Sequence, residues 1–179
     1  MLLVVFSGGS GASAVPIEWT VASGGNGHFY EVISAPGMFW GEAHANALLL
    51  GSGWDLASVT SQEEQDFIVS LLPTSPFQRE HYWLGGYQPV AVGSWEWTNG
   101  SPFVYTDWWA GEPNDLNGVG LDWVALDWRS DAWHWNDLSN HSSNGPLISG
   151  YVVSTVPEPN TALLLGIGLA SLAVRREKR

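Results

Sequence analysis

The sequence predicts an α+β fold, with two helices in its first half and a strand-rich, loop-rich second half. Three observations support this prediction. Within the body of the chain, apolar residues at helical spacing occur only before residue 73. After residue 73 the apolar and aromatic residues occur in short runs, which are typical of strands. Residues 105–120 are rich in Gly, Asn, Asp and Pro, which are typical of a loop. With 179 residues, 45% of them hydrophobic, and 12 Trp, the chain is long enough for one domain with a packed core.

The first half contains the simpler elements. Residues 17–37 alternate short apolar pieces with Gly-rich turns, which predicts two short strands. Residues 38–49 are Ala-rich, with apolar residues at helical spacing, and predict a helix that ends at Gly51. A short strand is predicted at residues 56–59.

A second helix is predicted after that strand. Ser61 and Glu64 form a capping-box pattern, in which the serine caps the helix and the glutamate reaches back to it. The apolar spacing continues to Pro73, where the helix has to stop. Beyond it the short apolar runs predict strands at residues 82–87, 95–97, 123–126, 132–135 and 150–153.

Charge and composition exclude several classes of function. From Met1 to Thr155 the chain has 16 acidic residues and only two basic ones, Arg79 and Arg129, a net charge of about −14. Such a surface repels phosphate backbones, so we expect no nucleic-acid partner. Without cysteine the chain has no disulfide, no cysteine-ligated zinc and no thiol chemistry.

The two ends of the chain have the character of targeting segments. Residues 1–14 contain a short apolar run followed by Ala-Ser-Ala, the pattern that precedes cleavage of a secretory signal. Residues 156–179 contain Pro-Glu-Pro, an apolar helix at about 161–174 and a basic end. This helix would span about 20 Å, so by length alone it is a marginal membrane anchor or a buried helix. The body of the protein is therefore assigned to residues 15–155.

The C-terminal segment resembles the PEP-CTERM sorting signal of Gram-negative bacteria, because all three of its parts occur in order at the end of the chain. The resemblance implies export, a transient inner-membrane anchor, removal by an exosortase, and release to the surface or outside of a bacterium that makes exopolysaccharide. It implies nothing about the activity of the body.

Two short polar motifs in the body, called the polar strings below, contain the candidate ligand residues. Glu112-Pro113-Asn114 lies in the long loop, and Asn136-Asp137 follows 21 residues later. Each string offers one carboxylate and one amide oxygen, the kinds of ligand that calcium prefers. The bond before Pro113 is of the type that can be cis, which would turn the flanking side chains the same way. A sugar with two vicinal hydroxyls could bind such an ion and hydrogen-bond to its ligands.

The body resembles a C-type lectin domain over about residues 27–153. The residues that carry the resemblance are the capped helix after Leu56-Ala57-Ser58-Val59, Trp83-Leu84-Gly85-Gly86, Trp97-Thr98-Asn99-Gly100, Glu112-Pro113-Asn114 and Trp135-Asn136-Asp137. The resemblance implies a C-type lectin-like fold with antiparallel sheets and a long calcium and ligand loop. It also implies that Glu112, Asn114, Asn136 and Asp137 bind both calcium and sugar. A Glu-Pro-Asn string goes with mannose- and glucose-type diols, and Gln-Pro-Asp with galactose.

The sequence departs from the family pattern in three ways. The family's disulfides are missing, and Leu48, Trp123 and the segment after Trp135 occupy the regions where its cysteines fall. Large aromatic side chains are expected to replace those cross-links by packing.

The second departure concerns the calcium of the sugar site. Leu121 stands where a further acidic ligand would precede Asp122, so this calcium lacks one carboxylate unless Asp115 or Asp107 compensates. The third departure concerns an auxiliary calcium site, for which the family uses acids just after the core strand. Here Gln88-Pro89-Val90-Ala91 stands there, so only Asp115 and Asp122 remain as candidate ligands of that site.

These observations favour an exported, calcium-dependent lectin that recognises mannose- or glucose-type diols of a cell-surface or extracellular polysaccharide. The alternative is a C-type lectin-like adhesion, protein-binding or matrix protein that binds no sugar. A third possibility, an enzyme such as a glycoside hydrolase, is least favoured, because the sequence has neither a Ser–His–Asp signature nor a Gly-rich phosphate loop. We therefore expect no catalytic residue.

Overall fold

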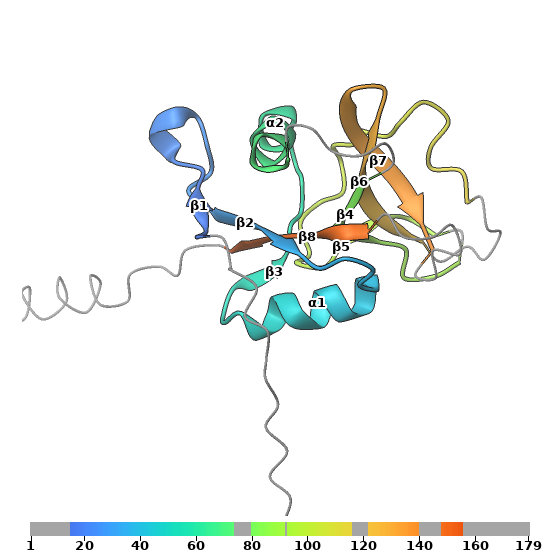
Figure 1. The fold of residues 1–179 in the computed structure, drawn as a ribbon, viewed down its shortest axis with the longest axis horizontal. Coiled ribbons are helices and arrows are strands. Elements are labelled where there is room, and N and C mark those ends of the chain that lie inside the picture. The colour runs from blue at the N-terminus through green and yellow to red at the C-terminus, as the bar shows by residue number, and fades with distance from the viewer. Residues whose placement is uncertain (1–14, 74–79, 92, 116–121, 140–147, 156–179) are drawn as a thin grey trace, which may run out of the picture.

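Strands β8 and β4 form the centre of a mixed sheet in the computed structural model of the chain (Figure 1). The structure describes residues 15–73, 80–91, 93–115, 122–139 and 148–155. The elements are β1 (Ile17–Glu18), a 3-10 turn η1 (Val21–Ser23), β2 (Phe29–Ser34), α1 (Trp40–Leu49), β3 (Trp54–Leu56), α2 (Gln62–Leu71), β4 (His81–Tyr87), β5 (Glu96–Trp97), β6 (Trp123–Arg129), β7 (Ala132–Leu138) and β8 (Ile148–Thr155).

The described strands follow the order β1-β2-β8-β4-β6-β7, with β3 paired to β8 and β5 paired to β4. The expectation of purely antiparallel sheets is wrong in one place, because β4 and β8 run parallel. Strand β6 turns directly into β7, and the two pair along their whole length, from Trp123 opposite Leu138 to Arg129 opposite Ala132. Strand β7 is the last strand of this path, so one of its edges has no strand beside it among the described residues.

The sheet carries an apolar core on each face, because neighbouring residues of a strand point to opposite sides. On β6, Val124 and Leu126 belong to the core that includes Ile68 of α2, while Ala125 belongs to the core that includes Ala43 of α1. Figure 1 shows the same division, with α1 and α2 on opposite sides of the central strands. The predicted α+β class is confirmed.

Both helices begin near their predicted starts, but the cap of α2 differs from the expectation. The Ser61 hydroxyl accepts a hydrogen bond from the Glu64 backbone at 3.2 Å, as a capping box requires. The Glu64 carboxylate does not return to Ser61; it accepts hydrogen bonds from the backbone and hydroxyl of Thr60, both at 2.7 Å. It also accepts one from the Tyr30 hydroxyl, so Glu64 ties α2 to β2.

Most predicted strands are present, and one is misplaced. Residues 57–59 were expected to be a strand, but β3 ends at Leu56. The Ala57 backbone donates to Val152 of β8 at 2.9 Å and accepts from Gly85 of β4 at 2.9 Å, so this segment crosses between two strands instead of extending one.

Aromatic packing partly takes the place of the missing cross-links. Trp123 lies 5.8 Å from Trp40 of α1, and Trp40 lies 5.9 Å from Tyr87, measured between ring centroids. Leu48 does not contribute, because its side chain is exposed. The segment beyond Ser139, up to residue 147, lies outside the described residues.

The targeting segments predicted at 1–14 and 156–179, including the apolar helix at 161–174, also lie outside the described residues. Within the described part of the chain, neither helix is long and apolar enough to span a membrane.

Candidate functional site

The long loop is attached to the free edge of β7 at Trp135. The Trp135 N–H donates to the carbonyl of Asp107 at 2.7 Å, and the Trp109 N–H donates to the carbonyl of Trp135 at 2.9 Å. These two backbone hydrogen bonds fix the register between loop and strand. The residues that follow in the loop are therefore held next to those that follow Trp135 in β7.

The Trp135 side chain makes this attachment rigid. It is fully buried, and its indole N–H donates to the Gln65 side chain of α2 at 3.0 Å. Four aromatic rings lie within about 6 Å of it, centroid to centroid, and all approach edge-on: Trp97, Phe103, Tyr105 and Trp108. Edge-on contacts of this kind favour one packing arrangement. The loop is thus anchored by a core cluster only a few residues before its polar string.

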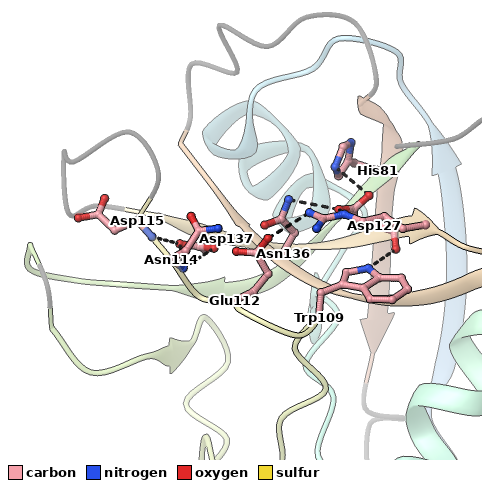
Figure 2. Close-up of polar contacts among 9 residues, drawn as sticks. His81, Trp109, Glu112, Asn114, Asp115, Asp127, Asn136 and Asp137 are labelled. Carbon is pink, nitrogen blue, oxygen red and sulfur yellow. Dashed lines mark hydrogen bonds and ion pairs between the residues drawn. The ribbon is translucent and has the colours of Figure 1, made fainter.

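The two polar strings meet beyond this anchor (Figure 2). The Asp137 carboxylate accepts hydrogen bonds from the Asn114 backbone at 3.1 and 3.0 Å and from the Asp115 backbone at 2.7 Å. The Glu112–Pro113 peptide bond is cis, a form open to a bond before proline. The structure therefore brings the loop string and the strand string together, 21 residues apart in sequence.

Glu112 has a largely buried carboxylate, with its side chain only 6% exposed. Its Oε1 accepts a hydrogen bond from Arg129 Nη2 at 3.2 Å, whereas its buried Oε2 has no hydrogen-bond partner among the described residues. Burial raises the pKa of Glu112, and the nearby Asp137 carboxylate raises it further, against the opposing effect of Arg129. The Glu112 and Asp137 carboxylates thus lie close together, and one buried oxygen of Glu112 has no hydrogen-bond partner among the described residues.

Asn136 is also buried, and the direction of its amide is fixed. Its Nδ2 donates to Asp127 Oδ2 at 3.2 Å, so the amide oxygen faces away from Asp127. Asn114, by contrast, is exposed. Of the four predicted site residues, Glu112, Asn136 and Asp137 therefore have buried side chains, and Asn114 is exposed.

The two further candidate ligands lie beside this group. Burial raises the pKa of Asp122 to about 6, and the charges of Asp137 and Asp115 contribute to the shift. The buried Oδ2 of Asp122 has no hydrogen-bond partner within the part of the chain that the structure describes. Leu121, which stands in place of an acidic ligand, lies outside the described residues.

This donor set fits a hard cation. The orphaned oxygens of Glu112 and Asp122 are buried carboxylate atoms, which are costly to leave without a partner. Calcium takes carboxylate and amide oxygens, and its charge would oppose both the burial and the like-charge repulsion that raise the two pKa values. Among the described residues, no group of three or more His, Asp or Glu side chains is placed to hold a metal. Amide oxygens would therefore have to complete the ligand set.

Sequence reasoning missed Asp127 and Arg129 of β6. The Arg129 guanidinium contacts both Asp127 and Glu112, and it lies 5.8 Å from the Trp109 ring centroid. His81 Nε2 lies 3.2 Å from Asp127 Oδ1. Burial alone would raise the pKa of Asp127, but His81 and Arg129 lower it below its usual value. Arg129 could have been noticed as one of two basic residues in an acidic body.

The sequence as a whole identifies the class of this fold and site. Residues 49–147, more than half of the chain, match the sequence profile of the lectin C-type domain, so the chain belongs to the C-type lectin domain family. Residues 155–179 match the PEP-CTERM protein-sorting motif. Both resemblances drawn from the motifs are confirmed.

Individual relatives are similar over this domain. Ladderlectin from Oncorhynchus mykiss is 33% identical over 100 residues, which cover 56% of this chain and 50% of that protein. The C-type lectin lectoxin-Lei1 from Leioheterodon madagascariensis is 32% identical over 105 residues, which cover 59% of this chain and 66% of that protein. The chain thus spans about half to two-thirds of the length of these curated relatives.

Solved structures share the fold. The C-type lectin domain of murine dendritic cell inhibitory receptor 2, in complex with N-glycan, superposes with a TM-score of 0.58 at 26% identity, covering 72% of this chain and 90% of that one. A calcium-independent type II antifreeze protein superposes with a TM-score of 0.59 at 25% identity, covering 82% of this chain and 98% of that one. Membership of the family therefore does not by itself establish a calcium requirement.

Proposed function

We propose that this protein is an exported lectin that binds the vicinal diols of mannose- or glucose-type sugars through a calcium ion. The sugars would belong to a cell-surface or extracellular polysaccharide. The protein would bind them without transforming them. The observation that carries this proposal is the buried, orphaned Oε2 of Glu112, whose carboxylate lies beside that of Asp137.

Different residues of the site would bind the calcium, the sugar and the loop backbone. Glu112, Asn114, Asn136 and Asp137 would hold the calcium, with Asp115 and Asp122 as the adjacent acids. A bound calcium would supply a positive centre for two sugar hydroxyls. Asp137 also holds the loop, since it accepts the backbone N–H groups of Asn114 and Asp115. The exposed amide of Asn114 is left to face a sugar in solvent.

Specificity for mannose-type diols is supported by the motif itself. A glutamate and an asparagine present one acceptor and one donor to the sugar hydroxyls, and the resemblance to the family relates this order to mannose- and glucose-type ligands. Several relatives and neighbours are lectins by name, and one neighbour was solved with N-glycan.

The sorting motif supports export. In the proposed route, exosortase-type machinery in the inner membrane of a Gram-negative bacterium recognises the C-terminal segment, which serves as a transient anchor. The mature body then reaches the cell surface or the medium, where polysaccharide is available.

A glycan array probed with the purified protein tests the proposal. We expect binding to mannose- and glucose-type glycans in millimolar calcium and loss of binding in EDTA. Glu112→Gln should weaken binding, whereas Glu18→Gln, which neutralises an exposed acid on β1, should not. Binding that is equal in calcium and EDTA would contradict the proposed mechanism. No binding to any glycan would favour the adhesion or matrix alternative.

A further inference from the structure

Asp127 and Arg129 connect the two halves of the proposed calcium site. Asp127 is fully buried, and its Oδ2 accepts hydrogen bonds from Asn136 Nδ2 at 3.2 Å and from Arg129 Nε at 2.5 Å. Arg129 Nη2 then donates to Glu112 Oε1 at 3.2 Å. One continuous chain of contacts thus runs from Asn136 on the strand to Glu112 in the loop. Figure 2 shows Asn136 in contact with Asp127, with Glu112 close by.

The sheet explains why these residues face the same way. In the β6–β7 hairpin, Ala125 lies opposite Asn136 and Asp127 lies opposite His134. Alternate residues of a strand share a face, so Asp127 and Arg129 project to the side of the sheet that carries Asn136. Glu112 reaches this side from the loop that runs along the β7 edge.

Further contacts hold the pair in place. The Trp109 indole N–H donates to the Asp127 carbonyl at 3.0 Å, and the same ring lies 5.8 Å from the Arg129 guanidinium carbon. His81 Nε2 lies 3.2 Å from the other carboxylate oxygen of Asp127. The planar guanidinium has several donors in a fixed fork, so it can hold Asp127 and Glu112 at the same time.

We propose that Asp127 and Arg129 are positioning residues that orient Asn136 and Glu112 as calcium ligands. This inference rests on the proposed function. Asp127 directs the Asn136 amide nitrogen towards itself and so leaves the amide oxygen for the ion. Arg129 occupies one oxygen of Glu112 and leaves the other, orphaned oxygen for the ion.

The local charge balance allows Arg129 to orient Glu112 without competing with calcium for the site. A lone arginine beside the site would repel a divalent cation. Here the guanidinium is paired with the buried Asp127 carboxylate, so the pair is close to neutral as seen from the ion. Partners of metal ligands in other proteins typically change metal affinity by about 10- to 100-fold when they are removed.

Calcium titration calorimetry and tryptophan-sensitised terbium luminescence on the full chain test the inference. We expect Arg129→Met to weaken calcium about 10-fold or more and Arg129→Lys to recover part of that loss. The matched control is Arg79→Met, which removes the only other basic side chain of residues 1–155 and should leave the affinity unchanged. Calcium binding by Arg129→Met that equals or exceeds the wild type would overturn the inference, because Arg129 would then be neutral or a competitor.

A double-mutant cycle separates positioning from general stability. In a Glu112→Gln background, Arg129→Met should cost much less calcium affinity than in the wild type, because its effect passes through Glu112. Asp127→Asn provides a second route, with the side-chain amide signals of Asn136 followed by NMR in EDTA; we expect them to move. If the single variants lower only the melting temperature in EDTA and leave calcium affinity intact, the residues are merely structural and the inference fails.

The same calcium-binding data distinguish failure of the proposed function from failure of the positioning role of Asp127 and Arg129. A wild-type chain that takes up no calcium overturns the proposed function and this inference with it. A wild-type chain that binds calcium, together with an unaffected Arg129→Met variant, overturns this inference alone.

Discussion

The Asp137 carboxylate on β7 holds the backbone of Asn114 in the loop, with both of its oxygens within 3.1 Å of the Asn114 nitrogen. This contact joins a residue of the hairpin to a residue of the polar string, so the ligand loop has a fixed position relative to the sheet. It also gives Asp137 two tasks, because the same carboxylate is a proposed calcium ligand. The consequences of removing it are correspondingly large.

Replacing Asn136 and Asp137 together by alanine should abolish calcium-dependent sugar binding. The change removes two proposed ligands and releases the loop backbone, so we expect calcium affinity to fall by at least an order of magnitude. Calorimetry with calcium, followed by a glycan array, measures both effects. Glu18→Ala serves as the control for loss of an exposed acid. Sugar binding that survives both this double substitution and EDTA would rule out the calcium mechanism.

Calcium should raise the melting temperature of the protein. A ligand that binds only the native state adds about 2.7 kcal/mol at one hundred times its Kd, which corresponds to about 5–10 °C for a domain of this size. Thermal unfolding followed by circular dichroism in EDTA and in millimolar calcium measures this shift. Identical unfolding curves would contradict calcium binding and would favour the adhesion or matrix alternative.

Exchanging the donor and the acceptor in the loop should change sugar preference. Glu112→Gln combined with Asn114→Asp retains one carboxylate and one amide but swaps their positions. We expect preference to move from mannose-type to galactose-type diols, by about 10-fold in relative affinity, which is within the 1–3 kcal/mol cost of an unpaired polar group. Competition with free mannose and galactose measures the ratio. An unchanged ratio would mean that these two side chains do not contact the sugar hydroxyls.

Asp122 should make the calcium-free protein more stable in mild acid. Its pKa in the folded state is raised to about 6, above the usual value of 3.8, so between these pH values the folded state binds more protons than the unfolded state. The contribution of this residue to the free energy of unfolding therefore decreases as pH rises from 4 to 6. Asp122→Asn should remove this dependence and gain stability relative to the wild type at pH 7. We expect a gain of about 1 kcal/mol, because solvent screening reduces the roughly 3 kcal/mol that the full pKa shift would give.

Urea unfolding of the wild type and Asp122→Asn in EDTA, at pH 4.5 and pH 7, measures the difference. The other carboxyl groups titrate in both proteins, so only the difference between the two proteins is informative. A difference that is equal at both pH values would contradict the raised pKa.

Glu64 should be a structural residue with no part in sugar binding. Its buried carboxylate accepts hydrogen bonds from Tyr30 and Thr60, and Glu64→Gln replaces one acceptor oxygen with a donor. We expect a loss of about 2 kcal/mol in the free energy of unfolding, because a buried partner is left without its hydrogen bond. Glu63→Gln is the matched control, since Glu63 is the exposed neighbour on the same helix. Similar losses in both variants would contradict the role of Glu64.

Much of the fold was predictable from the sequence because its signals are local. Apolar spacing predicted both helices, a cap marked the start of the second, and short apolar or aromatic runs predicted most of the strands. The exception at residues 57–59 arises from tertiary context, because the backbone there bonds to β8 on one side and β4 on the other. An apolar run of four residues does not distinguish a strand from a buried crossing segment.

The proposed ligands were predictable from residue type and order, but their supporting residues were not. The string around Glu112 and the pair at Asn136 and Asp137 are unusual as sequences. Asp127 and Arg129 become significant only when the register of the β6–β7 hairpin places them beside Asn136, and register is set by pairing in three dimensions. Burial, which raises the pKa of Glu112, is likewise a property of the assembled loop.

The attachment of the loop at Trp135 has a consequence for self-association. An unpaired strand edge is a template on which a second molecule can add its own strand. Here the backbone of residues 107–109 bonds to both polar groups of Trp135, and the Asp137 carboxylate secures the continuation of the loop alongside. The segment that carries the candidate ligands therefore also shields the last strand of the sheet. Substitutions that detach this loop should expose β7 and promote aggregation as well as loss of ligand.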